Sequence, residues 1–223
     1  MISFSWGLPS SKKQADYLNR TRQGEFNLDE NYVGSTLREP FSENFQKDLE
    51  KDGFFINNAR IKLGTGEAMF LRARKSLISW SQFQLGWTSV DANTPVEIKQ
   101  RFLVRVNEMI VAWLLQPLEI KYVLDTHCTK MQTCPPNASS SINSEKLKGV
   151  FAFGSVTLKG HLLSGEDMFS IKWEEDDSVW YETLSFSKPA TFLSLATYPY
   201  VQWKQKLFAK QSSVALLKAV SDS

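Results

Sequence analysis

FAFGSVTLKGHLLSGEDMFSIKWEEDDSVWYETLSFSKP, residues 151–189, is the stretch of sequence that predicts the fold. In three runs, residues 151–158, 168–173 and 179–186, apolar side chains recur at every second position or aromatic and β-branched residues dominate, as in half-buried strands. A short turn and the loop EEDDS, which is too polar to bury, connect these runs. Pro189 ends the third run because it has no N–H for a ladder. The stretch therefore predicts three consecutive antiparallel strands.

The same pattern predicts further strands upstream. A strand is expected at 54–63, directly after Gly53. The next segment is interpreted as a hairpin, with strands at 83–90 and 96–106 around the turn DANTP. Pro117 is expected to break the chain before another alternating strand at 118–124.

Helical periodicity predicts two helices before the last strand run. Pro9-Ser10-Ser11 is a suitable cap for a helix from about residue 12 to residue 22. Glycines at 64 and 66 lead into a second helix, 67–80, which has one apolar stripe. A shorter helix at 41–51 is also compatible with the sequence. The polar segment 25–52 that contains it is expected to lie over the domain as an arm.

A long helix is predicted at the C-terminal end, residues 200–220. Two apolar stripes run along it, one with Trp203 and Val214 and the other with Val201 and Phe208. Its four cationic side chains are Lys204, Lys206, Lys210 and Lys218. These lysines either point into solvent or form a basic surface for an anionic membrane.

This order of elements predicts an α+β fold. Residues 1–52 are expected to form an N-terminal helix and polar arm, and residues 53–220 a single domain with a mobile loop at 126–147. The order resembles the helix-grip (START-like) fold, in which a curved antiparallel sheet wraps around a long C-terminal helix. Such a fold implies a cavity between sheet and helix, and the chain has enough aromatic residues to line one.

Composition excludes several classes of protein. A net charge of +2 does not indicate a nucleic-acid binder. Cys128 and Cys134 are expected to be two reduced thiols, because no secretory signal precedes them and the protein is not expected to be secreted. No second ligand pair accompanies them, so no metal and no cofactor is predicted. The most apolar run, residues 109–115, is far shorter than a spanning helix of about 20 residues.

Several segments carry a resemblance to a known family. FAFGSVTLKGHLLSGEDMFSI, VWYETLSFSKPA and YPYVQWKQKLFAKQSS resemble the C-terminal motifs of uncharacterised protein family five-four-eight, also called domain of unknown function nineteen-ninety. FSWGLPS and DGFFINNARIKLGTG resemble its plant branch. The family's glycine-rich strand has a tyrosine and a second glycine where this chain has Phe153 and Val156. The resemblance covers most of the chain and implies no catalytic residue.

The resemblance also implies a location and a function. Plant members resemble a small outer-envelope protein of chloroplasts described as a cation-selective pore. The resemblance therefore implies a chloroplast outer-envelope location; the alternative expectation is a cytosolic one. Few predicted strands reach the roughly 9–11 residues of a membrane-spanning strand, so a pore would need an oligomer or a rearranged state.

The candidate ligand-binding residues are His161, Glu166, Trp180, Trp203 and Phe153. His161 and Glu166 could form an acid–base pair, or His161 could be a structural residue that ties its turn to Glu166. Three classes of function remain open. They are a non-enzymatic protein that binds a small hydrophobic ligand, an envelope pore, and an enzyme of unknown reaction.

Overall fold

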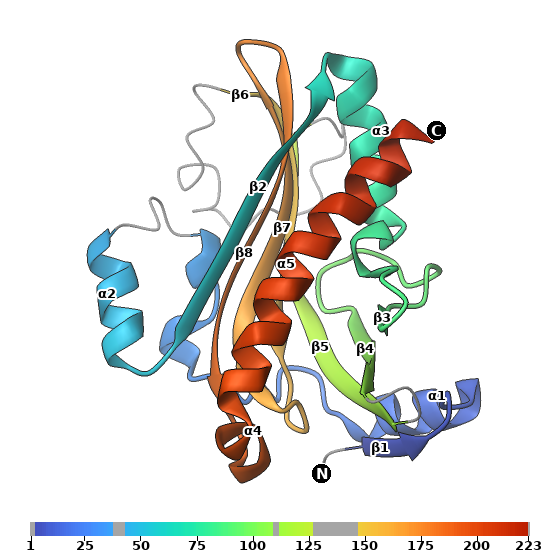
Figure 1. The fold of residues 1–223 in the computed structure, drawn as a ribbon, viewed down its shortest axis with the longest axis vertical. Coiled ribbons are helices and arrows are strands. Elements are labelled where there is room, and N and C mark those ends of the chain that lie inside the picture. The colour runs from blue at the N-terminus through green and yellow to red at the C-terminus, as the bar shows by residue number, and fades with distance from the viewer. Residues whose placement is uncertain (1–2, 38–42, 109–111, 127–146, 223) are drawn as a thin grey trace.

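The computed structural model describes residues 3–37, 43–108, 112–126 and 147–222. These residues form an antiparallel eight-stranded sheet in the order β2-β8-β7-β6-β5-β4-β3, and β1 pairs with β5 (Figure 1). The strands are β1 (Ser3–Trp6), β2 (Phe55–Thr65), β3 (Thr88–Ser89), β4 (Arg101–Glu108), β5 (Ala112–Asp125), β6 (Leu147–Thr157), β7 (Leu163–Glu174) and β8 (Ser178–Pro189). The three strands predicted from residues 151–189 are confirmed as the consecutive antiparallel strands β6, β7 and β8.

The helical elements lie on both sides of this sheet. They are α1 (Ser11–Arg20), η1 (Glu30–Tyr32), η2 (Ser35–Leu37), α2 (Glu43–Lys51), α3 (Glu67–Ile78), η3 (Ser81–Phe83), α4 (Phe192–Ala196) and α5 (Tyr198–Ser221). The Ser10 hydroxyl accepts a hydrogen bond from the Lys13 N–H and caps α1, as predicted. Pro199 lies in the first turn of α5, where its missing N–H costs nothing.

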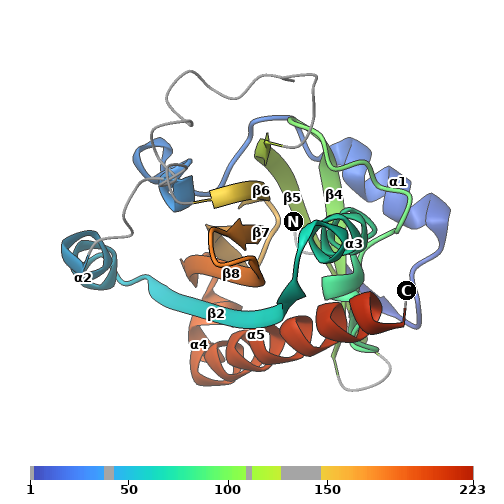
Figure 2. The same cartoon turned by 90° about the horizontal axis from the view of Figure 1, so that it is seen from above.

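The sheet is strongly curved, and its concave side holds the main core. Figure 2 shows α3 inside the curve of the strands and α5 along the side that the strands leave open. Aromatic and aliphatic side chains from α3, β6 and β7, including Phe70, Phe153 and Phe169, pack there with Leu216 of α5. The expected α+β fold, a curved antiparallel sheet wrapped around a long C-terminal helix, is confirmed.

The arm covers the convex side of the sheet. Leu28 and Leu49 of the arm, with Phe54 just after it, pack against Val156 of β6 and Phe186 of β8. Both faces of the central strands are therefore buried, and no described residue from 149 to 158 is exposed. Val156 fills this convex cluster and does not line the space next to α5. The domain boundary after residue 52 stays a prediction.

Three predictions were wrong in detail. The strand expected at 83–90 overlaps the end of the short helix η3 at Phe83 and contains only the two-residue strand β3. The strand expected at 96–106 is present as β4 but begins only at Arg101. Pro117 does not break the chain but lies within β5. The Pro117 carbonyl accepts a hydrogen bond from the Leu158 N–H, one residue beyond the end of β6. The ladder between β5 and β6 stops at this point, so the N–H that proline lacks is missing only at the end of the ladder. The loop expected at 126–147, with both cysteines, falls almost entirely outside the described residues.

The inward face of α5 also differs from the prediction. Trp203 and Val214, which share one of the two predicted apolar stripes, are each 56% exposed. The buried face instead carries Ala209, Ser212 and Leu216, and the Tyr181 hydroxyl of β8 donates to the Ser212 hydroxyl at 3.4 Å. Small residues on this face let the helix approach the sheet closely, so packing space rather than hydrophobicity sets its orientation.

Candidate ligand-binding cavity

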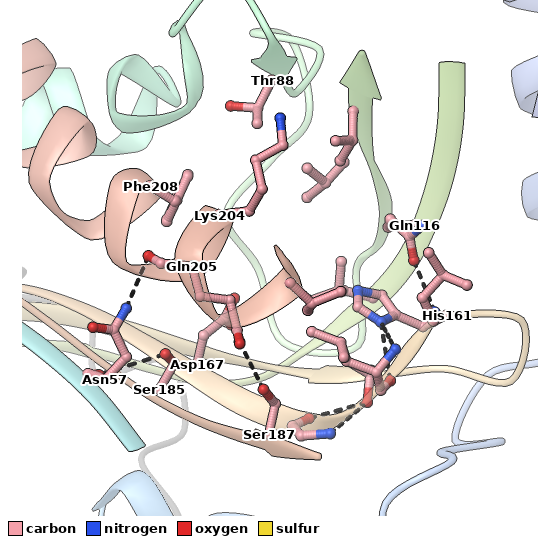
Figure 3. A pocket seen from close by; sticks show the side chains of 18 of the residues that line it. Asn57, Thr88, Gln116, His161, Asp167, Ser185, Ser187, Lys204, Gln205 and Phe208 are labelled. Carbon is pink, nitrogen blue, oxygen red and sulfur yellow. Dashed lines mark hydrogen bonds between the residues drawn. The ribbon is translucent and has the colours of Figure 1, made fainter. Parts of the chain in front are cut away.

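A cavity of about 230 Å³ lies between the concave face of the sheet and the first half of α5. Its wall is mostly apolar and aromatic, with Phe83, Trp87, Val104, Phe169, Val201 and Phe208 among the residues that line it. Ligand pockets usually range from about 300 to 1,000 Å³, so this one suits a small molecule. Figure 3 shows the side chains that surround the space.

One row of polar residues crosses the apolar wall. Asn57 of β2 pairs in register with Ser185 of β8, Ser185 with Asp167 of β7, and Asp167 with Ser155 of β6. Residues paired in this way share one face of a sheet. The polar groups of four neighbouring strands therefore meet at one level of the concave face, with Gln205 of α5 opposite them (Figure 3).

Asp167 is the acidic residue of this row. The Ser155 hydroxyl donates a hydrogen bond to the Asp167 carboxyl oxygen Oδ1. Burial raises the pKa of Asp167 to about 7, and the neighbouring charge of Glu166 adds to the rise, while the Ser155 hydrogen bond opposes it. A carboxyl group that changes charge near neutral pH therefore lies on the wall of an apolar cavity.

His161 lies at the end of the cavity, in the turn between β6 and β7. Burial lowers the pKa of His161 to about 4, so the imidazole is neutral at pH 7. Its Nδ1 atom accepts from the Leu163 N–H at 2.9 Å. The Gln116 side-chain oxygen accepts from the Leu162 N–H at 2.9 Å and ties the same turn to β5. These contacts give His161 a structural role in the turn.

Lys204 contributes the cationic group of the cavity. Its Nζ lies 3.6 Å from Glu108 Oε2 and 3.9 Å from the centre of the Trp87 ring. The Lys204 side chain is only 16% exposed. Lys204 was predicted to be a membrane-surface residue; the structure places it in the cavity wall instead. Lys206, Lys210 and Lys218 are exposed, and their contact with a membrane stays a prediction.

Glu166 and His161 were predicted as a pair, but they bond to different partners. The Glu166 carboxylate accepts from the Gly34 N–H at 2.5 Å and from both the N–H, at 2.8 Å, and the hydroxyl of Thr36. The Thr36 and Tyr122 hydroxyls are also hydrogen-bonded, at 2.6 Å. Glu166 therefore anchors the arm on the convex side, and we assign it a structural role.

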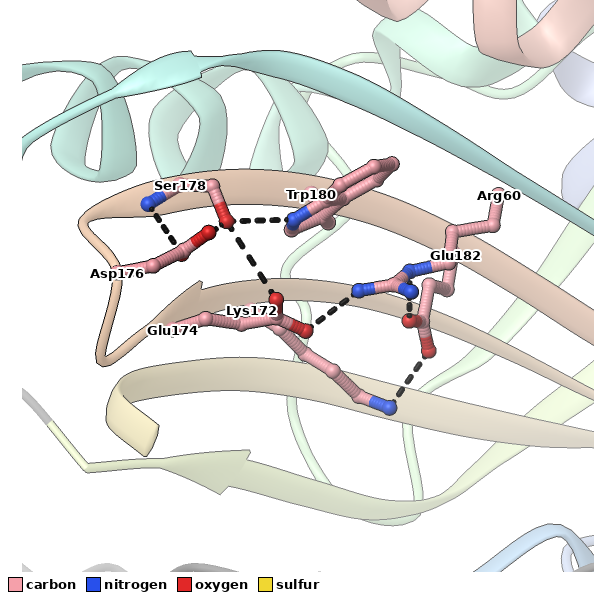
Figure 4. Close-up of polar contacts among 7 residues, drawn as sticks. All are labelled: Arg60, Lys172, Glu174, Asp176, Ser178, Trp180 and Glu182. Carbon is pink, nitrogen blue, oxygen red and sulfur yellow. Dashed lines mark hydrogen bonds and ion pairs between the residues drawn. The ribbon is translucent and has the colours of Figure 1, made fainter. Parts of the chain in front are cut away.

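Trp180 lies on the outer face of the sheet rather than in the cavity (Figure 4). The Arg60 guanidinium lies 4.0 Å from the centre of the Trp180 ring and pairs with Glu182 at 2.8 Å. Lys172 pairs with the same Glu182 at 2.6 Å. These contacts connect β2, β8 and β7, so Trp180 belongs to a cross-strand network that stabilises the sheet.

Neither of the two remaining predicted residues lines the cavity. Phe153 is fully buried in the core behind it, against Trp80 and Phe169. Trp203 lies on the outward face of α5, as described above. The predicted set therefore contributes His161 and Glu166 to the lining.

Sequence reasoning missed Asp167, although a signal for it existed. The alternation that places Phe169 and Ile171 on one face also places Asp167, two residues earlier, on that face. A single acidic residue on the apolar face of a buried strand is unusual, because an unpaired buried carboxylate is costly. Ser185 and Asn57 carry no such signal, since their alignment with Asp167 depends on strand pairing.

The chain is similar in sequence to known proteins over most of its length. A sequence profile described as Domain of unknown function (DUF1990) matches residues 42–215. A UPF0548 protein of Arabidopsis thaliana is 41% identical over 223 residues, with 100% of both chains covered. A UPF0548 protein of Dictyostelium discoideum is 28% identical over 228 residues, which cover 99% of this chain and 97% of the relative.

Among solved structures, a conserved protein from Geobacillus kaustophilus matches with a TM-score of 0.44 and 11% identity. The match covers 76% of this chain and 97% of that protein. A similarity of this size transfers no activity. The assignment of the fold rests on the strand order and on the position of α5.

Proposed function

The chain belongs to the family described as Domain of unknown function (DUF1990), whose members include UPF0548 proteins, and from this premise we propose that it binds a small, largely apolar ligand without catalysing a reaction. The observation that carries the proposal is the cavity of about 230 Å³ between the concave face and α5. An apolar cavity with a few polar groups at one level is the usual form of a small-molecule site.

Binding is favoured over catalysis by the groups that line this cavity. Acid–base catalysis needs a base within hydrogen-bond reach of a partner or of the reacting proton. The described residues show no hydrogen bond between His161 and Asp167, and the His161 Nδ1 atom is already bonded to the backbone. The Ser155 hydroxyl, which donates to Asp167, is fully buried and is not among the residues that line the cavity. We therefore propose a binding protein.

Filling the cavity tests this proposal. We expect the 223-residue chain to bind 1-hexanol with a Kd of about 1 mM or lower, because each buried methylene contributes about 0.8 kcal/mol. Val201→Trp, in the lining, should weaken this binding by at least tenfold in isothermal titration calorimetry.

The control is Val214→Trp, on the outward face of the same helix, where Val214 is 56% exposed. This variant should bind 1-hexanol as the wild type does. Equal affinities for both variants, or no binding by the wild type, would show that the cavity does not take apolar ligands.

The chloroplast outer-envelope location and the cation-selective pore remain predictions from the resemblance alone, and no comparison adds support to either. Within the part of the chain that the structure describes, no helix is both long and apolar enough to cross a membrane. Contact of α5 with an anionic membrane likewise remains a prediction from the sequence.

A further inference from the structure

We propose that the ligand carries a protonated amine, that its ammonium group binds the Asp167 carboxylate, and that its apolar part lies against the aromatic wall. This inference rests on the proposed function, since it names the class of ligand for the same cavity. Three independent features lead to it: the balance of hydrogen-bond donors and acceptors, the charges, and the shape of the lining.

The donors of the polar row are bonded within the protein, whereas one buried acceptor of Gln205, opposite the row, is not. Asn57 Nδ2 donates to the Gln205 carbonyl at 2.9 Å, and Gln205 Nε2 donates to the Ser187 hydroxyl at 2.7 Å. The Ser155 hydroxyl donates to Asp167. In contrast, the buried Gln205 Oε1 atom has no hydrogen-bond partner among the described residues. A buried acceptor without a donor is costly, so a ligand with N–H groups fits this row best.

Charge favours a cation over a neutral donor. The charged residues that line the cavity are Glu108, Glu166, Asp167 and Lys204. Glu108 and Lys204 face each other at 3.6 Å, and Glu166 is bonded to the arm. Asp167 is thus the lining carboxylate for which the described residues show no ion pair. An ammonium group can form a charge-assisted hydrogen bond with it, which is about twice as strong as a neutral one.

The remaining lining suits the rest of such a ligand. Phe83, Trp87, Phe169 and Phe208 all border the cavity, and they come from three separate parts of the chain. Aromatic faces attract organic cations as well as alkyl groups. The small volume limits the ligand to a short chain or a single ring.

The charge state of Asp167 adds a pH dependence to amine binding. With a pKa near 7, Asp167 is mostly protonated at pH 5.5 and ionised at pH 8. An alkyl amine stays protonated over this range, so amine affinity should rise about thirtyfold from pH 5.5 to pH 8 and then level off. The titratable groups around Asp167 are Glu166, His161, Tyr122 and Tyr181, besides the Glu108–Lys204 pair. His161 titrates below this range, because its pKa is about 4. Burial raises the pKa of both tyrosines above the usual value of 10, so they stay protonated.

Three ligands with the same chain length separate the contribution of the ammonium charge to the affinity from that of the apolar chain. Hexylamine, 1-hexanol and hexanoate are titrated into the 223-residue chain at pH 8 and pH 5.5 by isothermal titration calorimetry. At pH 8 we expect hexylamine to bind at least tenfold more tightly than 1-hexanol, and hexanoate to bind most weakly. Only hexylamine should lose affinity at pH 5.5.

Asp167→Asn assigns the effect to one carboxyl group, since asparagine keeps the size and the acceptor for Ser155. This variant should lose at least tenfold in affinity for hexylamine, bind 1-hexanol within about threefold of the wild type, and show no dependence on pH. Glu175→Gln removes one negative charge from the exposed turn between β7 and β8 and should leave all three affinities unchanged.

The outcomes distinguish the two proposals. If 1-hexanol binds but hexylamine binds no better at pH 8, the amine proposal is overturned and the apolar cavity stands. If none of the three ligands binds, the proposed function fails as well. Should Asp167→Asn not fold, the pH series on the wild type decides, because an affinity for hexylamine that is equal at both pH values contradicts a role for Asp167.

Discussion

Glu166→Ala is expected to lower the free energy of unfolding by about 3–5 kcal/mol. The Glu166 carboxylate is 2% exposed and accepts hydrogen bonds from the Gly34 N–H and from the N–H and hydroxyl of Thr36. Removing the carboxylate leaves these buried donors without their acceptor, and each unpaired donor costs about 1–3 kcal/mol. Urea denaturation followed by circular dichroism measures the change.

A matched pair of variants separates anchoring from charge. Glu175→Ala, in the exposed turn between β7 and β8, should change the free energy of unfolding by less than about 0.5 kcal/mol. Hydrogen exchange should also show faster opening of residues 30–37 in Glu166→Ala than in the wild type. Equal stability of the two variants, with unchanged exchange in the arm, would refute the anchoring role of Glu166.

Gly154→Ala is expected to cost about 3 kcal/mol or more. Gly154 of β6 pairs in register with Tyr122 of β5, and a Cβ atom added at Gly154 would overlap the far end of the fully buried Tyr122 ring. The Tyr122 ring cannot move away freely, because its hydroxyl is bonded to Thr36 of the arm. Thermal and chemical denaturation of the purified variant give the cost.

A double-mutant cycle isolates this contact. Tyr122→Leu removes the ring atoms that an alanine at position 154 would meet. In that background, Gly154→Ala should cost less than about 1 kcal/mol, which gives a coupling energy of about 2 kcal/mol. The same cost in both backgrounds would mean that Gly154 is required for another reason than the space it leaves for Tyr122.

Much of the fold could be predicted because the strands of this chain alternate clearly. The three runs between Phe151 and Pro189 correspond to β6, β7 and β8, and a serine after Pro9 marks the start of α1. The orientation of α5 could not be predicted in the same way. Trp203 and Val214 carry more apolar surface than Ala209 and Ser212, yet the smaller pair faces the sheet. Close packing decided the orientation, and the hydrophobic pattern of one helix does not contain it.

The candidate site was predicted less well than the fold. Aromatic residues such as Trp180 and Phe153 were natural candidates, but one lies on the outer face under Arg60 and the other in the core. The polar row depends on the register between β2, β8, β7 and β6, which brings together residues up to 128 positions apart, as for Asn57 and Ser185. Sequence shows which residues share a face of one strand, but it does not show which residues of different strands lie side by side.

The central claim is that the space between the concave face and α5 takes a small apolar molecule. Backbone amide shifts in a titration of the isotope-labelled chain with 1-hexanol test it most directly. We predict saturable shifts concentrated at Phe169, Ser185, Val201 and Phe208, with the outward residues Trp203 and Val214 nearly unchanged. Shifts confined to exposed positions such as Phe192 and Trp203, or no saturation up to the solubility limit of 1-hexanol, would contradict the claim.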